Sequence, residues 1–172
     1  RIIVLVFFGV QYTDSDQSIM WLGSVDYSHF KFIEPRFYGQ DYNSMLESLL
    51  AVPLLKFGVP VHIALPIVTN ILTIFPFWII SNHFLKKGML VNSIFVLIVF
   101  VTLPLEYDLI TNLPRGFVTG LFISGFVYYF AFMSQNKYKY LLVGFLSLIA
   151  YSINPNSVVF NLPIIFLPRP FR

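Results

Sequence analysis

Long apolar runs constrain this chain more than any other feature of its sequence. The longest run covers residues 61–85, and further runs follow at 89–105 and 117–133. A helix of about 20 apolar residues is long enough to cross the hydrocarbon core of a bilayer. Charged residues make up only 11% of the chain, against about 25% of an average soluble domain. We therefore predict an all-α fold, a polytopic transmembrane helix bundle.

The remaining apolar pieces are too short to cross a membrane alone. Residues 140–153 and 158–167 flank the Asn-Pro-Asn sequence at 154–156, which predicts a broken or shallow helix pair buried against other protein segments. We interpret residues 1–10 as the last half of a first transmembrane helix. Residues 1–172 are expected to form a single membrane domain, the N-terminal fragment of a longer protein.

A polar segment at residues 11–60 separates the first apolar run from the others. We predict that it is a non-cytoplasmic loop with two short amphipathic helices. The first helix would run from about residue 16 to residue 25, and the second would begin at Asn43 or Ser44 and end at Gly58. The apolar face of the first helix would consist of Ile19, Met20, Leu22 and Val25.

Charged residues divide between the two sides of the predicted bundle. If residue 1 is cytoplasmic and the spans alternate, seven Lys and Arg lie on the cytoplasmic side and four on the other, in agreement with the positive-inside rule. All acidic residues fall on the non-cytoplasmic side, which is therefore expected to be lined by carboxylates. These acids are Asp14, Asp16, Asp26, Glu34, Asp41, Glu47, Glu106 and Asp108.

Some of these acids also have a purely structural interpretation. Asp14 with Gln17, and Ser44 with Glu47, have the spacing of a helix capping box, and Asp16 would favour the dipole of the first short helix. The chain has no Cys, which excludes disulfides and thiolate metal sites. No metal site is expected at the three histidines, because none has a partner at ligand spacing. These are His29, His62 and His83.

The polar segment also follows a family pattern. An acidic pair, Asp14 and Asp16, opens the first short helix. About 20 residues later comes Phe37-Tyr38-Gly39-Gln40-x-Tyr42-x-Ser44-x-Leu46-Glu47. This pattern resembles the GT-C superfamily of membrane glycosyltransferases, in particular the branch of dolichyl-phosphate-mannose protein mannosyltransferases and bacterial lipid A aminoarabinose transferases. Weaker matches are Pro114-Arg115-Gly116-Phe117 and Asn154-Pro155.

The resemblance implies a mechanism. Enzymes of this family move a sugar from a polyprenyl phosphate to an acceptor hydroxyl at the non-cytoplasmic face, with inversion at the anomeric carbon. Asp16 is the best match to the Asp that acts as general base, and Asp14 is the second candidate. Gln17 departs from the family, in which Glu is commoner at this position. The residues expected to bind substrate or to orient Asp16 are Arg36, Tyr38, Gln40, Tyr42, Glu47 and Arg115.

The expected partners and location follow from the same resemblance. The partners would be a polyprenyl-phosphate sugar, a lipid, glycan or protein acceptor, and the bilayer; no nucleic acid is expected. A divalent metal, Mg²⁺ or Mn²⁺, stays open as a cofactor. The protein would lie in the plasma or inner membrane or the endoplasmic reticulum, with its active face periplasmic, extracellular or lumenal. The alternative is a non-catalytic transporter, flippase or subunit that handles lipid-linked sugars. This alternative is less favoured. Transporters usually place ionisable groups inside their spans, whereas the predicted spans of this chain contain no Asp, Glu, Lys or Arg.

Overall fold

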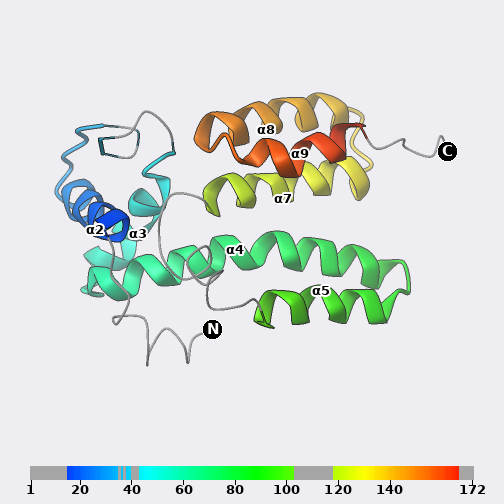
Figure 1. The fold of residues 1–172 in the computed structure, drawn as a ribbon, viewed down its shortest axis with the longest axis horizontal. Helices are drawn as coiled ribbons and strands as arrows, with labels where there is room; N and C mark the ends of the chain where they lie inside the picture. The colour runs from blue at the N-terminus through cyan, green and yellow to red at the C-terminus, as the bar shows by residue number, and fades with distance from the viewer. Residues whose placement is uncertain (1–14, 35, 37, 40–42, 103–117, 167–172) are drawn as a thin grey trace.

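The computed structural model describes residues 15–34, 36, 38–39, 43–102 and 118–166. Within these ranges the fold is all-α, as predicted, with seven helices and no strand (Figure 1). The helices are α2 (Ser15–Ser28), α3 (Leu46–Lys56), α4 (Val61–Lys86), α5 (Leu90–Thr102), α7 (Val118–Phe132), α8 (Lys139–Ile153) and α9 (Ser157–Phe166).

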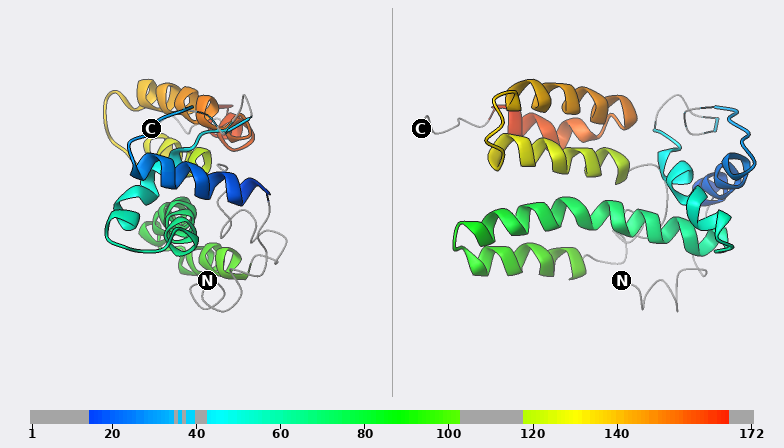
Figure 2. Two further views of the ribbon diagram at one scale, coloured as in Figure 1. Left: turned by 90° about the vertical axis from the view of Figure 1, so that its left-hand side faces the viewer. Right: turned by 180° about the vertical axis from the view of Figure 1, so that it is seen from behind.

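The longest helix, α4, organises the rest of the fold. Figures 1 and 2 show α5 along one side of α4 and α7 along the other, with α8 and α9 stacked on α7. These five helices lie with their axes nearly parallel or antiparallel. The short helices α2 and α3 pack together over the N-terminal end of α4, and we call them the α2–α3 lobe.

Small residues allow the helices of the bundle to approach closely. A Cβ atom at Gly125 of α7 would lie 3.1 Å from the Cα atom of Pro76 in α4. A Cβ atom at Gly120, near the start of α7, would lie 3.0 Å from the Cβ atom of Asn154. Close packing through glycine is common between helices in membranes, where van der Waals contact replaces the hydrophobic effect.

The predicted helix pair around residues 154–156 is an antiparallel hairpin of α8 and α9 (Figure 1). Asn154 ends α8 with extended backbone, at φ −148° and ψ 113°. Its side-chain Oδ1 accepts a hydrogen bond of 2.8 Å from the backbone N–H of Asn156, an Asx-type turn. The Asn-Pro-Asn sequence therefore reverses the chain and places both helices against α7.

The predicted apolar face of the first short helix is only half right, since Met20 is fully buried and Ile19 packs against the core. Leu22 and Val25 are exposed, and the buried face of α2 consists of Gln17, Met20, Gly23, Ser24 and Tyr27. The reason is the fit against α3, in which Gly23 leaves room for the side chain of Met45. The second helix begins later than predicted, at Leu46, because Asn43 has a left-handed backbone with φ 62°.

Only α4 among the described helices is long and apolar enough to cross a membrane, and half of its most apolar stretch is buried. The core helix of a soluble protein meets the same criterion. The helices α5, α7, α8 and α9 are apolar but have 10–15 residues each. Membrane crossing by several helices therefore stays a prediction.

The turn after α2 contains a strained residue. Lys31 N donates to Asp26 O at 2.9 Å and Phe30 N donates to Tyr27 O at 3.0 Å, and both bonds close the end of the helix. Phe30 lies at φ 61°, where glycine is usual and another residue costs about 1–2 kcal/mol. Lys56 Nζ lies 5.3 Å from the centroid of the Phe30 ring, and such an exposed contact contributes about 0.5–1 kcal/mol. This contact does not offset the strain.

Candidate functional site

A buried carboxylate joins the α2–α3 lobe to α4. The side chain of Glu47 is fully buried, and its Oε2 atom accepts a hydrogen bond of 2.8 Å from Thr69 Oγ1 in α4. The N-cap of α3 is Met45, and it makes no side-chain capping hydrogen bond. The predicted capping box is made only in part: Ser44 Oγ accepts a hydrogen bond of 3.4 Å from the backbone N–H of Leu46, whereas Glu47 Oε2 pairs with a helix distant in the sequence.

A neighbouring serine joins α3 to α2. Ser48 Oγ donates a hydrogen bond of 2.9 Å to the backbone carbonyl of Met20, and Ser24 Oγ donates to the same carbonyl at 2.9 Å. Ser24 and Ser48 are fully buried. Each buried hydroxyl thus has an acceptor, as buried polar groups require. The orientation of α2, whose first turn carries Asp16, is therefore set by α3.

The loop after α2 is held by two tyrosines of the lobe. Tyr27 OH donates to the backbone carbonyl of Glu34 at 2.8 Å, and the Tyr27 ring stacks on Phe32 with centroids 5.2 Å apart. Tyr38 OH lies 3.5 Å from Asp26 Oδ2, which is long for a hydroxyl donor. Burial raises the pKa of Tyr38 to about 12, helped by the nearby Tyr27 and Asp26.

The loop ends by folding back on itself. Arg36 and Ser44 form a single antiparallel backbone bridge. Between them Gly39 lies at φ 79°, and Asn43 next to Ser44 lies at φ 62°. Glycine adopts such a conformation without cost, and asparagine is one of the few other residues that tolerate it. This reversal carries Arg36 and Ser44 to the end of α8, where both line a cavity.

Two cavities lie between this loop and the C-terminal end of α8. The first has a volume of about 400 Å³ and is lined by Arg36, Asn43, Ser44, Phe145, Leu148, Ile149, Ser152 and Ile153. The second has about 410 Å³ and is lined by Tyr27, Phe32, Glu34, Ser44, Met45, Leu46, Leu49 and Ile153. Ser44 and Ile153 belong to both linings, so the two cavities adjoin. The loop supplies polar groups, and α8 supplies a largely apolar wall.

The structure brings only part of the predicted site together. Arg36 lines a cavity, whereas Asp16 lines neither of the two. Tyr27, at the far end of α2, does line one; eleven residues of helix separate it from Asp16, about 16 Å along the axis. Four of the predicted site residues lie outside the described part of the chain: Asp14, Gln40, Tyr42 and Arg115.

Sequence reasoning missed several residues of these cavities. From the sequence, Glu34 is interpreted as a solvated acid of the loop. In the structure it lines the second cavity together with Ser44. Asn43 and Ser152 line the first cavity, from opposite walls. Asn43 stands at an unspecified position of the family-like pattern, so the pattern did not mark it. Nothing in the local sequence of α8 marks Ser152, because its place depends on how α8 packs.

The described residues do not form a metal site. No group of three His, Cys, Asp or Glu side chains among them is arranged to hold a metal ion. His62 lies near Trp21 in an edge-on ring arrangement with centroids 6.5 Å apart. His83 Nδ1 lies 2.9 Å from Tyr128 OH.

Comparison with known proteins adds no assignment. No protein-family model matches the chain, and searches of curated proteins and of solved structures find no match.

Proposed function

We propose that this protein is a membrane glycosyltransferase that takes a sugar from a polyprenyl phosphate and transfers it, with inversion, to an acceptor hydroxyl. The observation that supports this most is the pair of adjoining cavities. One wall carries Arg36 and Glu34 and the other is the apolar end of α8. A lipid-linked sugar has the same two parts, an anionic polar head and a long apolar chain.

The distribution of apolar side chains supports a membrane location. In α5 only Ser93 and Phe100 are buried, and large side chains such as Phe95 and Val101 are exposed. In α8 and α9 large apolar side chains such as Leu141, Val159 and Phe160 are likewise exposed. A soluble protein rarely exposes continuous apolar surface on this scale, whereas lipid covers such faces at no cost.

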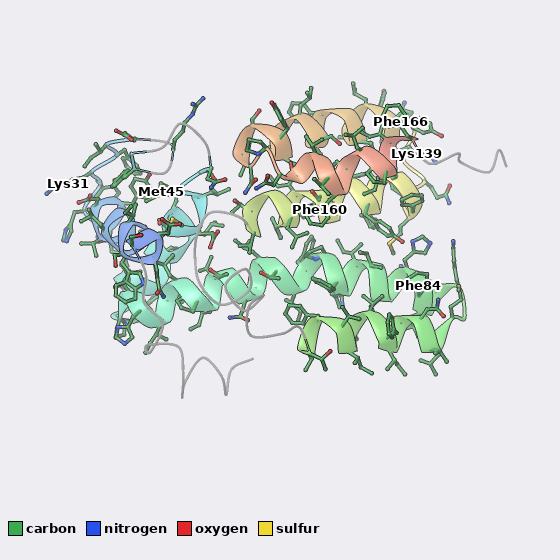
Figure 3. All side chains as sticks on the ribbon, viewed as in Figure 1. Lys31, Met45, Phe84, Lys139, Phe160 and Phe166 are labelled. Carbon is green, nitrogen blue, oxygen red and sulfur yellow. The ribbon has the colours of Figure 1, made fainter. Side chains whose placement is uncertain are left out.

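The charges of the bundle support the same location. Figure 3 shows Lys31 at the end near the α2–α3 lobe and Lys139 at the opposite end. The described acids, Asp16, Asp26, Glu34 and Glu47, all belong to the lobe and its loop. The turns at the opposite end carry the cations Lys86, Lys87, Lys137 and Lys139. We propose that this basic end is cytoplasmic, in line with the positive-inside rule.

The cavities suggest how a donor would bind. Arg36 would face the phosphate, because a guanidinium matches phosphate geometry and stabilises the charge that develops on the leaving group. The apolar residues of α8, such as Leu148 and Ile149, would contact the first part of the lipid chain. Asn43, Ser44 and Ser152 offer hydrogen-bonding groups beside the same cavity, where the sugar would lie.

Two carboxylates are candidates for the general base. Asp16 is supported by the family resemblance, and Glu34 by its place in the second cavity. A general base must come within hydrogen-bonding reach of the acceptor hydroxyl, directly or through one water. We propose Asp16 as the base, as the resemblance implies. Because Asp16 lies about 16 Å along α2 from Tyr27 of the second cavity, the lobe or the donor must move by about this distance for Asp16 to reach an acceptor hydroxyl that attacks the bound sugar. Glu34 would then contact the bound sugar.

The test is sugar transfer in membranes that contain the full chain. Radiolabelled polyprenyl-phosphate sugars are offered to the wild type, Asp16→Asn, Glu34→Gln and Arg36→Ala, with Asp26→Asn as a matched control on α2. Loss of a general base lowers the rate by about 10²–10⁴-fold, so Asp16→Asn should be nearly inactive. Asp26→Asn should retain most of the wild-type rate.

Other results would change the proposal in defined ways. A nearly inactive Glu34→Gln beside an active Asp16→Asn would move the base to Glu34. No transfer by a correctly inserted wild type, from any donor of the panel, would contradict the enzyme and favour the transporter, flippase or subunit. Arg36→Ala with both kcat and the KM for the donor unchanged would separate Arg36 from the phosphate.

A further inference from the structure

Two highly exposed aromatic rings follow the two helices of the α2–α3 lobe. Phe30, after α2, is 77% exposed and Phe57, at the end of α3, is 86% exposed. Lys56 joins them, because it precedes Phe57 and its Nζ atom lies 5.3 Å from the centroid of the Phe30 ring. Lys31 follows Phe30 and is also exposed. We call these four residues the Phe30–Phe57 patch.

The backbone at Phe30 shows that this arrangement is unfavourable for the isolated lobe. A bulky residue with positive φ is a true conformational outlier, and here it also leaves an apolar ring in solvent. The contact with Lys56 does not offset the strain, as described above. Outliers of this kind occur where another interaction compensates for them, so we expect the ring to meet an apolar environment outside the lobe.

The position of the patch in the fold indicates what that environment is. Phe57 is the C-cap of α3 and stands four positions before Val61, the first residue of α4. Gly58, at φ 83°, and Pro60 make the turn between the two helices. If α4 crosses the bilayer, its first turn lies at the membrane surface, and Phe57 lies at that level. Aromatic and basic side chains are the types that favour this layer.

We propose that the Phe30–Phe57 patch docks on the headgroup layer of an anionic phospholipid bilayer. The two rings enter the boundary between headgroups and acyl chains, while Lys31 and Lys56 contact lipid phosphates. The lobe is thereby held at a fixed height above the membrane, together with the loop that carries Arg36. This inference rests on the proposed membrane location, but not on the proposed sugar transfer.

The absence of cysteine from the chain allows a direct test. Single cysteines are introduced at Phe57, at Phe30, at the exposed Ile71 of α4 and at the exposed Ser18 of α2. Each full-length variant is labelled with an environment-sensitive fluorophore and reconstituted into phosphatidylcholine–phosphatidylglycerol vesicles. These vesicles contain lipids with a nitroxide quencher either near the headgroup or deep in the acyl chain. Position 71 reports on the membrane location, and position 18 is the control on the lobe.

The expected result differs at each position. Labels at 57 and 30 should show blue-shifted emission and stronger quenching by the shallow nitroxide than by the deep one. The label at 71 should be quenched mainly by the deep nitroxide, and the label at 18 should emit as in water. In the background Lys31→Gln/Lys56→Gln, shallow quenching at 57 should fall in phosphatidylglycerol-containing vesicles and stay unchanged in pure phosphatidylcholine.

Each contrary result has one meaning. Water-like emission at 57 and 30, with normal quenching at 71, would overturn the patch and leave the membrane location standing. A blue shift at 57 without quenching by the lipid nitroxides would also overturn the proposal, because protein would then cover the patch. Disulfide cross-linking between two unlabelled copies of the Phe57→Cys variant would identify that protein as a second chain. No quenching at 71 would contradict the membrane location itself.

Discussion

The two ends of α4 are both held by buried polar side chains, but in different ways. At the end near the α2–α3 lobe, the carboxylate of Glu47 accepts a hydrogen bond from Thr69. At the other end, neutral groups suffice: Tyr128 OH and His83 Nδ1 lie 2.9 Å apart, and the hydroxyls of Ser81 and Ser93 lie 2.8 Å apart. Buried side chains that are hydrogen-bonded in this way help to specify one packing arrangement of the helices.

The difference indicates where function is expected. The neutral pairs near the basic end join α4 to its neighbours, α7 and α5, and this is all that helix packing requires. In the loop between α2 and α3, the polar residues Arg36, Glu34 and Asn43 line cavities. This loop is therefore the part of the described chain that supplies most of the polar side chains lining the cavities.

The strongest test of this comparison is Thr69→Val. The valine keeps the shape of the side chain but removes a donor from a buried carboxylate, and we expect a loss of about 3 kcal/mol in unfolding free energy. The matched control is Thr73→Val, because Thr73 Oγ1 donates only to the Thr69 carbonyl of its own helix, at 2.7 Å. Thermal unfolding of the purified protein measures both. Equal losses in the two variants would contradict a special role for Glu47.

The middle of α4 offers a second test, which involves packing alone. Gly125→Ala places a Cβ atom 3.1 Å from the Cα atom of Pro76, and overpacking of this kind costs about 1–3 kcal/mol. Gly144→Ala is the control, since its Cβ atom would meet nothing within 4 Å. That exposed helical position should gain about 0.5–1 kcal/mol instead. A stabilising Gly125→Ala would show that α4 and α7 lie further apart.

Removal of a hydrogen bond at the basic end should lower the unfolding free energy less than removal of the Glu47–Thr69 hydrogen bond at the lobe. Tyr128→Phe removes a hydrogen bond between neutral groups, for which we expect a loss of about 1 kcal/mol. Tyr129→Phe, at the exposed neighbouring position, should leave the unfolding temperature unchanged. A loss in Tyr128→Phe as large as that in Thr69→Val would remove the distinction between the two ends.

The smallest expected effect is a pH dependence of folding stability that arises from Tyr38. The pKa of Tyr38 is about 12 in the folded protein, raised from 10.0 mainly by burial. Folding therefore favours the neutral phenol. This contribution to stability is complete below pH 10 and is lost as the pH rises to about 12, because only the unfolded chain then ionises readily. A titration of phenolate absorbance should lose its last-ionising component in Tyr38→Phe, and an unchanged curve would contradict the raised pKa.

The predicted site was only partly accessible from the sequence. The place of Asp16 in the first turn of a short helix was predicted from local signals and is confirmed. The capping role of Glu47 was predicted from spacing and is wrong, because Thr69 lies 22 positions away and the spacing of residues 44 and 47 carries no information about it. Glu34 and Ser152 reach the cavities only through the packing of the loop against α8.

The sequence by itself determined the helical class, the two short helices ahead of a long apolar one, and the separation of acids from most cations. These features depend on composition and on local periodicity, which act within a few residues. Tertiary structure alone decided which face of each helix is buried. Apolar periodicity predicted that Leu22 and Val25 face the core, yet α2 buries Gln17 and Gly23, because small and polar residues fit closely against α3. The inward face of α2 therefore combines apolar residues, such as Met20 and Tyr27, with small and polar residues that fit against α3.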